Sequence, residues 1–257
     1  MIEEKEWAEE WDLVNSYYEN STTLFKDWIY PNKIENFKNK IVLDCGCGSG
    51  EHLEILSPYI KEGYGVDMNP SKFLLRRFSN SSKIKILKDD IATMNLKKKF
   101  DIVFCIGVIH HTQDPDSSFK NIASHVKKNG KLMIWVYSYE GNFLNRTLLE
   151  CIKRTFLRKI DRKTLLLLAK IITIALYIPT YSIYLLPLQF LPFYEYFDNW
   201  RKLTYRMNVL NVFDKLNAPV THFIKKNTIN KWFNGGFKKI CIYGYKGVSW
   251  RASGTKE

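Results

Sequence analysis

Between residues 41 and 139, short apolar runs alternate with segments of helical periodicity. The apolar runs lie at residues 41–43, 63–67, 83–87, 100–106 and 131–139, and the helical segments at 51–60, 70–78 and 114–128. Strands and helices alternating at this spacing predict right-handed crossovers and a mostly parallel, doubly wound sheet. The run at 100–106 is apolar on both faces, which is typical of a central parallel strand.

The pattern differs on both sides of this alternating region. The first forty residues have apolar and aromatic positions at helical spacing, which predicts one or two helices. After residue 227, a short helix at 228–233 precedes two further strands at 237–243 and 248–252. These two strands would complete the sheet as an antiparallel hairpin.

The alternating pattern of strands and helices does not require the segment from about 141 to 210. We interpret this segment as a helical insertion over the substrate side. No charged residue occurs from Ile171 to Tyr194, but Pro179, Pro187 and Pro192 divide this stretch and Lys170 interrupts the longest helical pattern. Three interpretations stay open: a lid over a pocket, an interfacial helix on an anionic membrane, and a membrane span.

Composition adds limited information about the cell compartment and the partner. With 257 residues, 46% of them hydrophobic, the chain can bury a full core. The five cysteines lack paired metal-site spacing and the N-terminus does not resemble a signal peptide, so we expect free thiols, no metal and a cytoplasmic protein. The net charge of +13 suits a polyanionic partner or simply a solvated lysine-rich surface.

A glycine-rich loop follows the first apolar run directly. In Asp44-Cys45-Gly46-Cys47-Gly48-Ser49-Gly50, glycines at alternate positions permit a tight turn and a close approach of the backbone to a ligand. The spacing is not that of a dinucleotide loop, and Asp44 would repel a pyrophosphate. The loop could also be only a sharp turn between strand and helix.

Acidic residues end the next two predicted strands. Asp67 lies about twenty residues after the loop, where a carboxylate can accept hydrogen bonds from both ribose hydroxyls. Asp90 closes the third strand, where an adenine amino group would arrive. Each could instead be an ordinary helix cap, but their joint register favours a nucleoside site.

This constellation resembles the class I S-adenosylmethionine-dependent methyltransferases over residues 38–140, and more loosely over 220–252. The resemblance implies a Rossmann-like α/β fold with a mostly parallel seven-stranded sheet, strand order 3-2-1-4-5-7-6, and S-adenosylmethionine as the cofactor. We interpret the chain as one methyltransferase domain with N-terminal helices 1–40, cofactor-binding core 41–140, helical insertion 141–210, which the resemblance does not cover, and C-terminal completion 211–257. The cofactor-binding residues it implies are Asp44, Gly46, Cys47, Gly48, Gly50, Asp67, Met68, Asp90, Ile91 and Ile106.

Candidates for the chemistry follow the fourth strand. His110 and His111 lie at the carboxyl edge of the sheet, where a histidine could remove a proton from a hydroxyl or amine acceptor. Either histidine could instead cap a helix or contact the cofactor. Weaker substrate-contact candidates are Tyr17, Tyr18, Glu140 and His222.

The acceptor is the least determined part of the prediction. Gly107-Val108-Ile109-His110 stands where enzymes that methylate amino groups of nucleic acids carry an Asn/Asp-Pro-Pro-aromatic motif, which argues against a nucleic-acid partner. We expect methyl transfer to O or N of a small-molecule or glycan acceptor, with a lipid-linked acceptor and peripheral membrane contact through 160–195 as further hypotheses. An RNA or protein methyltransferase, or a cofactor-binding protein without transfer activity, stays as the alternative.

Overall fold

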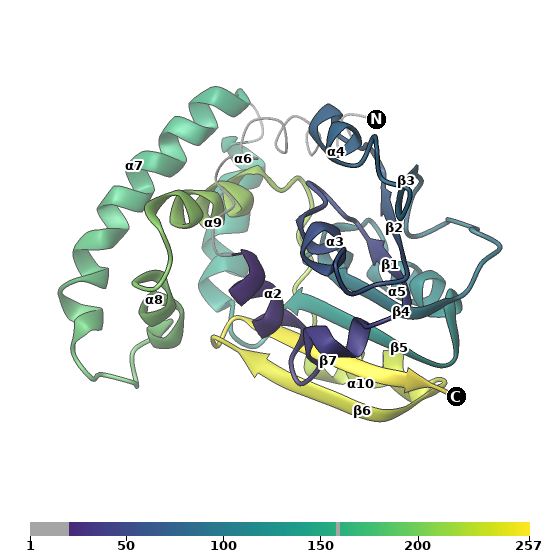
Figure 1. Ribbon diagram of the computed structural model, residues 1–257. Coiled ribbons are helices and arrows are strands. Elements are labelled where there is room, and N and C mark those ends of the chain that lie inside the picture. Colours follow the sequence, from purple (N-terminus) through teal and green to yellow (C-terminus); the bar gives the residue numbers. More distant parts are fainter. Residues whose placement is uncertain (1–20, 158–159) are drawn as a thin grey trace.

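The computed structural model describes residues 21–157 and 160–257, and its centre is a seven-stranded sheet (Figure 1). The strand order is β3-β2-β1-β4-β5-β7-β6; the first five strands in this order are parallel, and β7 is antiparallel to β5 and β6. This confirms the predicted Rossmann-like sheet with its C-terminal hairpin. The strands are β1 Ile41–Cys45, β2 Glu62–Asp67, β3 Ile84–Lys88, β4 Phe100–Ile106, β5 Val126–Tyr137, β6 Phe237–Tyr245 and β7 Ser249–Lys256.

Helices cover both faces of the sheet and form two separate hydrophobic cores with it. One core joins the strands to α5 (Pro115–Ser124) and α10 (Lys226–Asn234). The other joins them to α2 (Ser21–Ile29), the 3-10 helix η2 (Ile34–Phe37), α3 (Glu51–Leu56) and α4 (Lys72–Arg77). The buried faces of β1 and β4 therefore explain why both runs are almost wholly apolar.

The predicted helix at 114–128 is shorter in the structure. It begins after Asp114, whose carboxylate accepts hydrogen bonds from the N–H groups of Asp116 and Ser117, and it ends at Ser124. The backbone of the next two residues pairs with β4: Phe100 donates its N–H to the carbonyl of His125 and lies opposite Val126. Strand pairing thus ends the helix at Ser124 and not at the predicted residue 128.

Between β5 and α10 the chain forms a helical arm beside the sheet (Figure 1). The residues of the arm that the structure describes form a third hydrophobic core, in which Leu165 and Ala169 of α7 pack with Phe213 of α9. Two residues of α2, Leu24 and Trp28, connect this core to the sheet domain. The helices of the arm are the π-helical η4 Asn145–Leu149, α6 Glu150–Thr155, α7 Arg162–Thr180, the 3-10 helix η6 Ile183–Leu185, α8 Tyr194–Trp200 and α9 Tyr205–Asn217.

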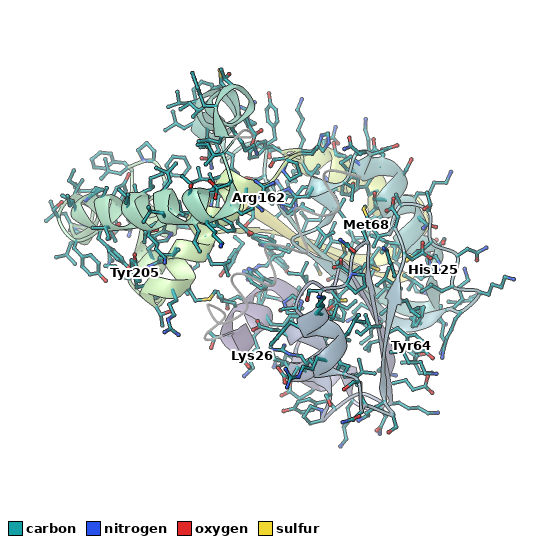
Figure 2. The ribbon with its side chains drawn as sticks, turned by 90° about the horizontal axis from the view of Figure 1, so that it is seen from above. Lys26, Tyr64, Met68, His125, Arg162 and Tyr205 are labelled. Carbon is teal, nitrogen blue, oxygen red and sulfur yellow. The ribbon has the colours of Figure 1, made fainter. Side chains whose placement is uncertain are left out.

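The long helix α7 differs from the broken pattern that the sequence suggested. It runs without interruption through Lys170, and Pro179 lies within it, next to its last residue, Thr180. Figure 2 shows α7 extending from Arg162 away from the part of the sheet that carries Tyr64. Within the described ranges, it is the one helix long and apolar enough to cross a membrane, a property that soluble core helices share.

The arm should be stabilised by the α7–α9 contact and not by the outer face of α7. Phe213 is fully buried and Leu167 is 58% exposed. We expect Phe213→Ala to lower the free energy of unfolding by about 3–5 kcal/mol because it leaves a cavity. Leu167→Ala should change it by less than about 0.5 kcal/mol. Urea denaturation measures both, and equal losses would contradict the description of α7 as an outer helix.

Candidate active site

The glycine loop lies between β1 and α3, at the point where the strand order reverses. Gly46, Gly48 and Gly50 have φ values of +77°, +51° and +80°, a conformation that other residues adopt only with strain. The N–H groups of Gly46 and Cys47 donate to the carbonyl of Val66 on β2. A Cβ atom on Gly46 would lie 2.5 Å from the Val108 side chain, so the loop after β1 lies directly against the loop after β4.

Asp67, at the end of β2, holds the glycine loop in place. Its carboxylate accepts hydrogen bonds from the N–H of Gly48 at 2.9 Å and from the N–H of Asn69 at 3.1 Å. Burial raises the pKa of Asp67, and the two N–H donors partly offset this rise. The carboxylate thus lies between the loop and the cavity that it faces.

A cavity of about 130 Å³ opens over the carboxyl ends of β1, β2, β3 and β4. That volume exceeds what a few water molecules occupy, so the cavity can hold part of an organic ligand. Most of the predicted nucleoside contacts are on its wall. The lining residues are Gly46, Gly48, Asp67, Met68, Asn69, Asp90, Ile91, Gly107, Val108, His111 and Thr112.

A second cavity, of about 180 Å³, lies between the glycine loop and the helical arm. It shares Gly46, Gly48, Gly107, Val108 and His111 with the first cavity, so the two meet at the loops after β1 and β4. Its aromatic walls come from α2, β5 and α8, and α8 and α9 contribute polar groups to it. These residues include Trp28, Trp135, Tyr137, Tyr196, Asn199, Trp200, Asn211, Asp214 and Lys215.

The two adjacent histidines occupy different environments. His110 is 0% exposed, lines neither cavity, and its ring lies 4.2 Å from that of His111 and 4.3 Å from that of Tyr137. His111 lines both cavities, and its Nδ1 lies 2.7 Å from the carbonyl of Val220. A carbonyl only accepts, so Nδ1 carries the proton and Nε2 of the neutral ring carries the lone pair. Burial lowers the pKa of His111 to about 4, so the ring is neutral at physiological pH.

Two of the predicted cofactor residues line neither cavity. A Cβ atom on Gly50 would lie 2.5 Å from Phe78 and 2.6 Å from Leu74, so this glycine permits α3 to pack on α4. Asp44 is buried, both its oxygens lack a hydrogen-bond partner among the described residues, and His52 Nδ1 lies 3.7 Å from its Oδ2. Burial raises the pKa of Asp44, and His52 partly opposes this. Asp44 is therefore placed to act through the loop.

The two weaker substrate candidates that the structure describes, Glu140 and His222, line neither cavity. Tyr17 and Tyr18 lie outside the described residues. Glu140 accepts hydrogen bonds from the N–H of Lys226 and from Trp250 Nε1, and His222 donates its N–H to the carbonyl of His110. Glu140 and His222 thus have structural contacts outside both cavities.

The structure adds residues that the sequence did not single out. Asn211, Asp214 and Lys215 follow one another at i, i+3 and i+4 on α9, so one helix face carries them into the second cavity. Glu51 lines the same cavity, and burial raises its pKa to about 7. The helical spacing on α9 was visible in the sequence, but nothing there indicated which face met the sheet.

Comparisons with known proteins agree with this geometry. A family model described as a methyltransferase domain matches residues 43–134. A magnesium protoporphyrin IX methyltransferase from Synechocystis shares the fold at 14% identity, with a TM-score of 0.52, over 95% of this chain and 85% of that one. An O-methyltransferase family protein from Burkholderia thailandensis does so at 10% identity, with a TM-score of 0.53, over 92% and 56%.

The chain carries a class I S-adenosylmethionine-dependent methyltransferase domain. Its curated relatives include tRNA U34 carboxymethyltransferases. That of Pseudoalteromonas atlantica is 29% identical over 42% of this chain and 35% of its own length. That of Campylobacter fetus is 33% identical over 38% and 37%. The matched region thus spans about a third of these relatives.

The predicted partners were wrong. We expected a small-molecule or glycan acceptor, lipid-linked in one form, with membrane contact through 160–195 and no nucleic acid, whereas these relatives are named for acting on tRNA. The Asn/Asp-Pro-Pro-aromatic motif recognises exocyclic amines. Its absence from the methyltransferase domain therefore excludes only one kind of nucleic-acid acceptor atom.

The residues of the methyltransferase domain fit its expected cofactor, S-adenosylmethionine. Asp67 offers a carboxylate at the wall of the first cavity, and Asp90 and Ile91 line that cavity further along the sheet edge. The close approach of the loop leaves Gly46 no space for a side chain. These features fit a nucleoside in the first cavity.

Binding of S-adenosylmethionine should depend on the missing Cβ of Gly46. We expect Gly46→Ala to weaken binding by about 5-fold to 150-fold, because the new side chain meets Val108 at a strained φ. Gly235→Ala is the matched control, because Gly235 has a φ of −84° and no atom within 4 Å of its Cβ position. Isothermal titration calorimetry measures both affinities, and equal affinities would contradict the assigned loop.

Glu51 should make stability depend on pH. Its pKa is about 7 in the folded domain and 4.5 as its ordinary value, so the folded state binds more protons between these values. The free energy of unfolding should therefore fall by about 3 kcal/mol as the pH rises through this window. Glu51→Gln should remove that fall, whereas Glu54→Gln, at an exposed position on the same helix, should keep it. Urea denaturation across the window provides the test, and a Glu51→Gln profile matching the wild type would contradict it.

Proposed function

We propose that this protein transfers a methyl group from S-adenosylmethionine to a nucleotide of RNA in the cytoplasm. The observation that supports the proposal is that His111, a neutral histidine, lines both cavities where they meet. The tRNA relatives support RNA as the acceptor class. Because these relatives match over about a third of their length, the proposal does not specify which nucleotide or which atom is methylated.

The second cavity has the chemistry of a nucleobase pocket. Enzymes that modify bases hold an extruded base between aromatic side chains and read its edge with hydrogen bonds. Here Trp28, Trp135 and Tyr137 supply rings from one side, and Tyr196 supplies one from the arm. The amides and charged groups of α9 supply donors and acceptors on the same wall.

The charge of the protein supports a polyanionic acceptor. The net charge of +13 would attract RNA at long range and strengthen phosphate contacts. Two cations, Lys215 and Lys246, line the acceptor cavity itself. Lys215 donates to Tyr196 Oη at 2.8 Å and to the carbonyl of Asn211 at 3.1 Å. Despite burial, the Tyr196 hydroxyl and neighbouring groups hold the pKa of Lys215 above its ordinary value, so it stays charged.

S-adenosylmethionine, when bound, supplies an electrophilic methyl group on a sulfonium. His111 would accept on its Nε2 the proton that the attacking N–H or O–H loses, as the acceptor atom takes up the methyl group that the sulfonium gives up. The carbonyl of Val220 fixes the tautomer that makes this possible. The aromatic walls exclude water and align the acceptor.

Transfer to RNA and its dependence on His111 can be measured together. Incorporation of labelled methyl groups from S-adenosylmethionine into total RNA should occur with the wild type. His111→Asn should lower kcat by about 10²-fold to 10⁴-fold, because an amide can still donate to Val220 but cannot accept the proton. Its affinity for S-adenosylmethionine should stay unchanged. With a pKa of about 4, His111 should also produce no ionisation step in kcat/KM near neutral pH.

The matched control is His125→Asn. His125 is also a buried histidine with hydrogen bonds to both ring nitrogens, but it lines neither cavity and lies on the far side of the sheet domain from the arm (Figure 2). The His125→Asn variant should have the kcat of the wild type. If His111→Asn transfers methyl groups as fast as the wild type while His110→Asn loses activity, the assignment of the base is contradicted. If methyl groups reach only protein or small molecules, RNA as the acceptor is contradicted.

A further inference from the structure

A cluster of cations and exposed aromatic rings follows β5. The guanidinium carbon of Arg146 lies 3.6 Å from the ring centroid of Tyr139 and 5.8 Å from that of Phe143. Lys225 Nζ lies 4.8 Å from the Tyr139 ring. Tyr139 is 37% exposed and Phe143 is 62% exposed, so both rings reach solvent although the fold has apolar cores to bury them in.

A neighbouring pair extends this cluster. Lys226 Nζ lies 5.6 Å from the ring of Trp250, next to Lys225 in the chain. The carboxylate of Glu140 lies in the same region, but it is engaged by the Lys226 N–H and Trp250 Nε1. We call the set of three cations and three rings the basic aromatic surface: Tyr139, Phe143, Arg146, Lys225, Lys226 and Trp250.

Asn142 links the basic aromatic surface to the acceptor cavity along the chain. Asn142, between Tyr139 and Phe143 in the chain, lines that cavity and donates through Nδ2 to the carbonyls of Val248 and Ser138. Gly141 packs so closely on the turn between β6 and β7 that a Cβ atom there would lie 1.6 Å from a carbonyl oxygen. The segment is thus fixed at the rim of the cavity.

The chemistry of this surface is that of a single-stranded nucleic-acid contact. Exposed aromatic rings and guanidinium planes stack nucleobases, and lysines bind the phosphates between them. An aromatic ring that only filled a core would be buried, whereas Phe143 is mostly in solvent. One carboxylate among three cations leaves the surface basic, which complements a phosphate backbone.

We propose that the basic aromatic surface binds the nucleotides that flank the methylated base, while that base enters the adjoining cavity. This inference rests on the proposed function, since it assumes RNA as the acceptor. It adds a second contact region for the acceptor, outside the cavity, with bases stacked by Phe143 and Arg146 and phosphates bound by Lys225 and Lys226.

Two single variants separate stacking from charge. With a short fluorescein-labelled single-stranded RNA, we expect Phe143→Ala to raise the Kd by about tenfold without changing its salt dependence. Lys225→Ala should weaken binding and lower the salt slope, d log K/d log[salt], by about 1. Fluorescence anisotropy at several salt concentrations measures both quantities.

Matched controls and a second measurement make the outcome decisive. Phe190→Ala removes a ring that is 81% exposed on the arm, and Lys238→Ala removes an exposed cation on β6; both should bind RNA like the wild type. The affinity of each variant for S-adenosylmethionine, measured by calorimetry, should stay unchanged and so reports an intact fold.

The inference and the proposed function fail differently. If the wild type binds and methylates RNA, and Phe143→Ala and Lys225→Ala match it in Kd and salt slope, the basic aromatic surface is overturned and the proposed function stands. If the wild type binds S-adenosylmethionine but neither binds nor methylates RNA, both are overturned.

Discussion

The close contact between the loop after β1 and the loop after β4 is the constraint on which the site depends. Gly46 lies so near Val108 that a side chain at this position would collide with it. These loops follow adjacent parallel strands whose connections leave in opposite directions, and such a reversal opens a crevice at the carboxyl edge of a sheet. The contact divides that crevice into two cavities that meet at one histidine.

The helical arm completes the second cavity and has its own means of stability. Its core of α7 and α9 is separate from the two cores of the sheet, and α2 links it to them through Leu24 and Trp28. A self-supporting arm can present Asn211, Asp214 and Lys215 to the cavity at fixed positions, because α9 is anchored on its opposite face. The arm is apolar on its inner side because these residues pack against one another. The outer face of α7 is exposed.

The sequence predicted the sheet and most of the nucleoside site because both follow from local patterns. Apolar runs separated by helices specify a parallel sheet, and strand ends place Asp67 and Asp90 at one edge. Which of His110 and His111 reaches the cavities was not predictable, because consecutive residues in a 3-10 turn point in different directions that only tertiary packing decides. Gly50 and Asp44, also predicted from the loop, line neither cavity: Gly50 lies against Leu74 and Phe78 of the α4 region, and Asp44 is buried below the loop.

The acceptor side was predicted least well. The second cavity combines residues from α2, β5, α8 and α9, which are far apart in the chain, so no local motif announces it. The uncharged stretch from Ile171 to Tyr194, which begins within α7, suggested membrane or lipid chemistry, and the absence of one amine-binding motif was given too much weight against nucleic acid. The net charge of +13 was the feature that pointed toward a polyanion.

A crystal structure with S-adenosylhomocysteine tests the central claim most directly, because it locates the nucleoside and the sulfur. The account predicts the ribose hydroxyls at the carboxylate of Asp67, the adenine beside Asp90 and Ile91, and the sulfur at the junction of the two cavities near His111. A nucleoside bound among Tyr196, Asn211 and Lys215, with the first cavity empty, would contradict it.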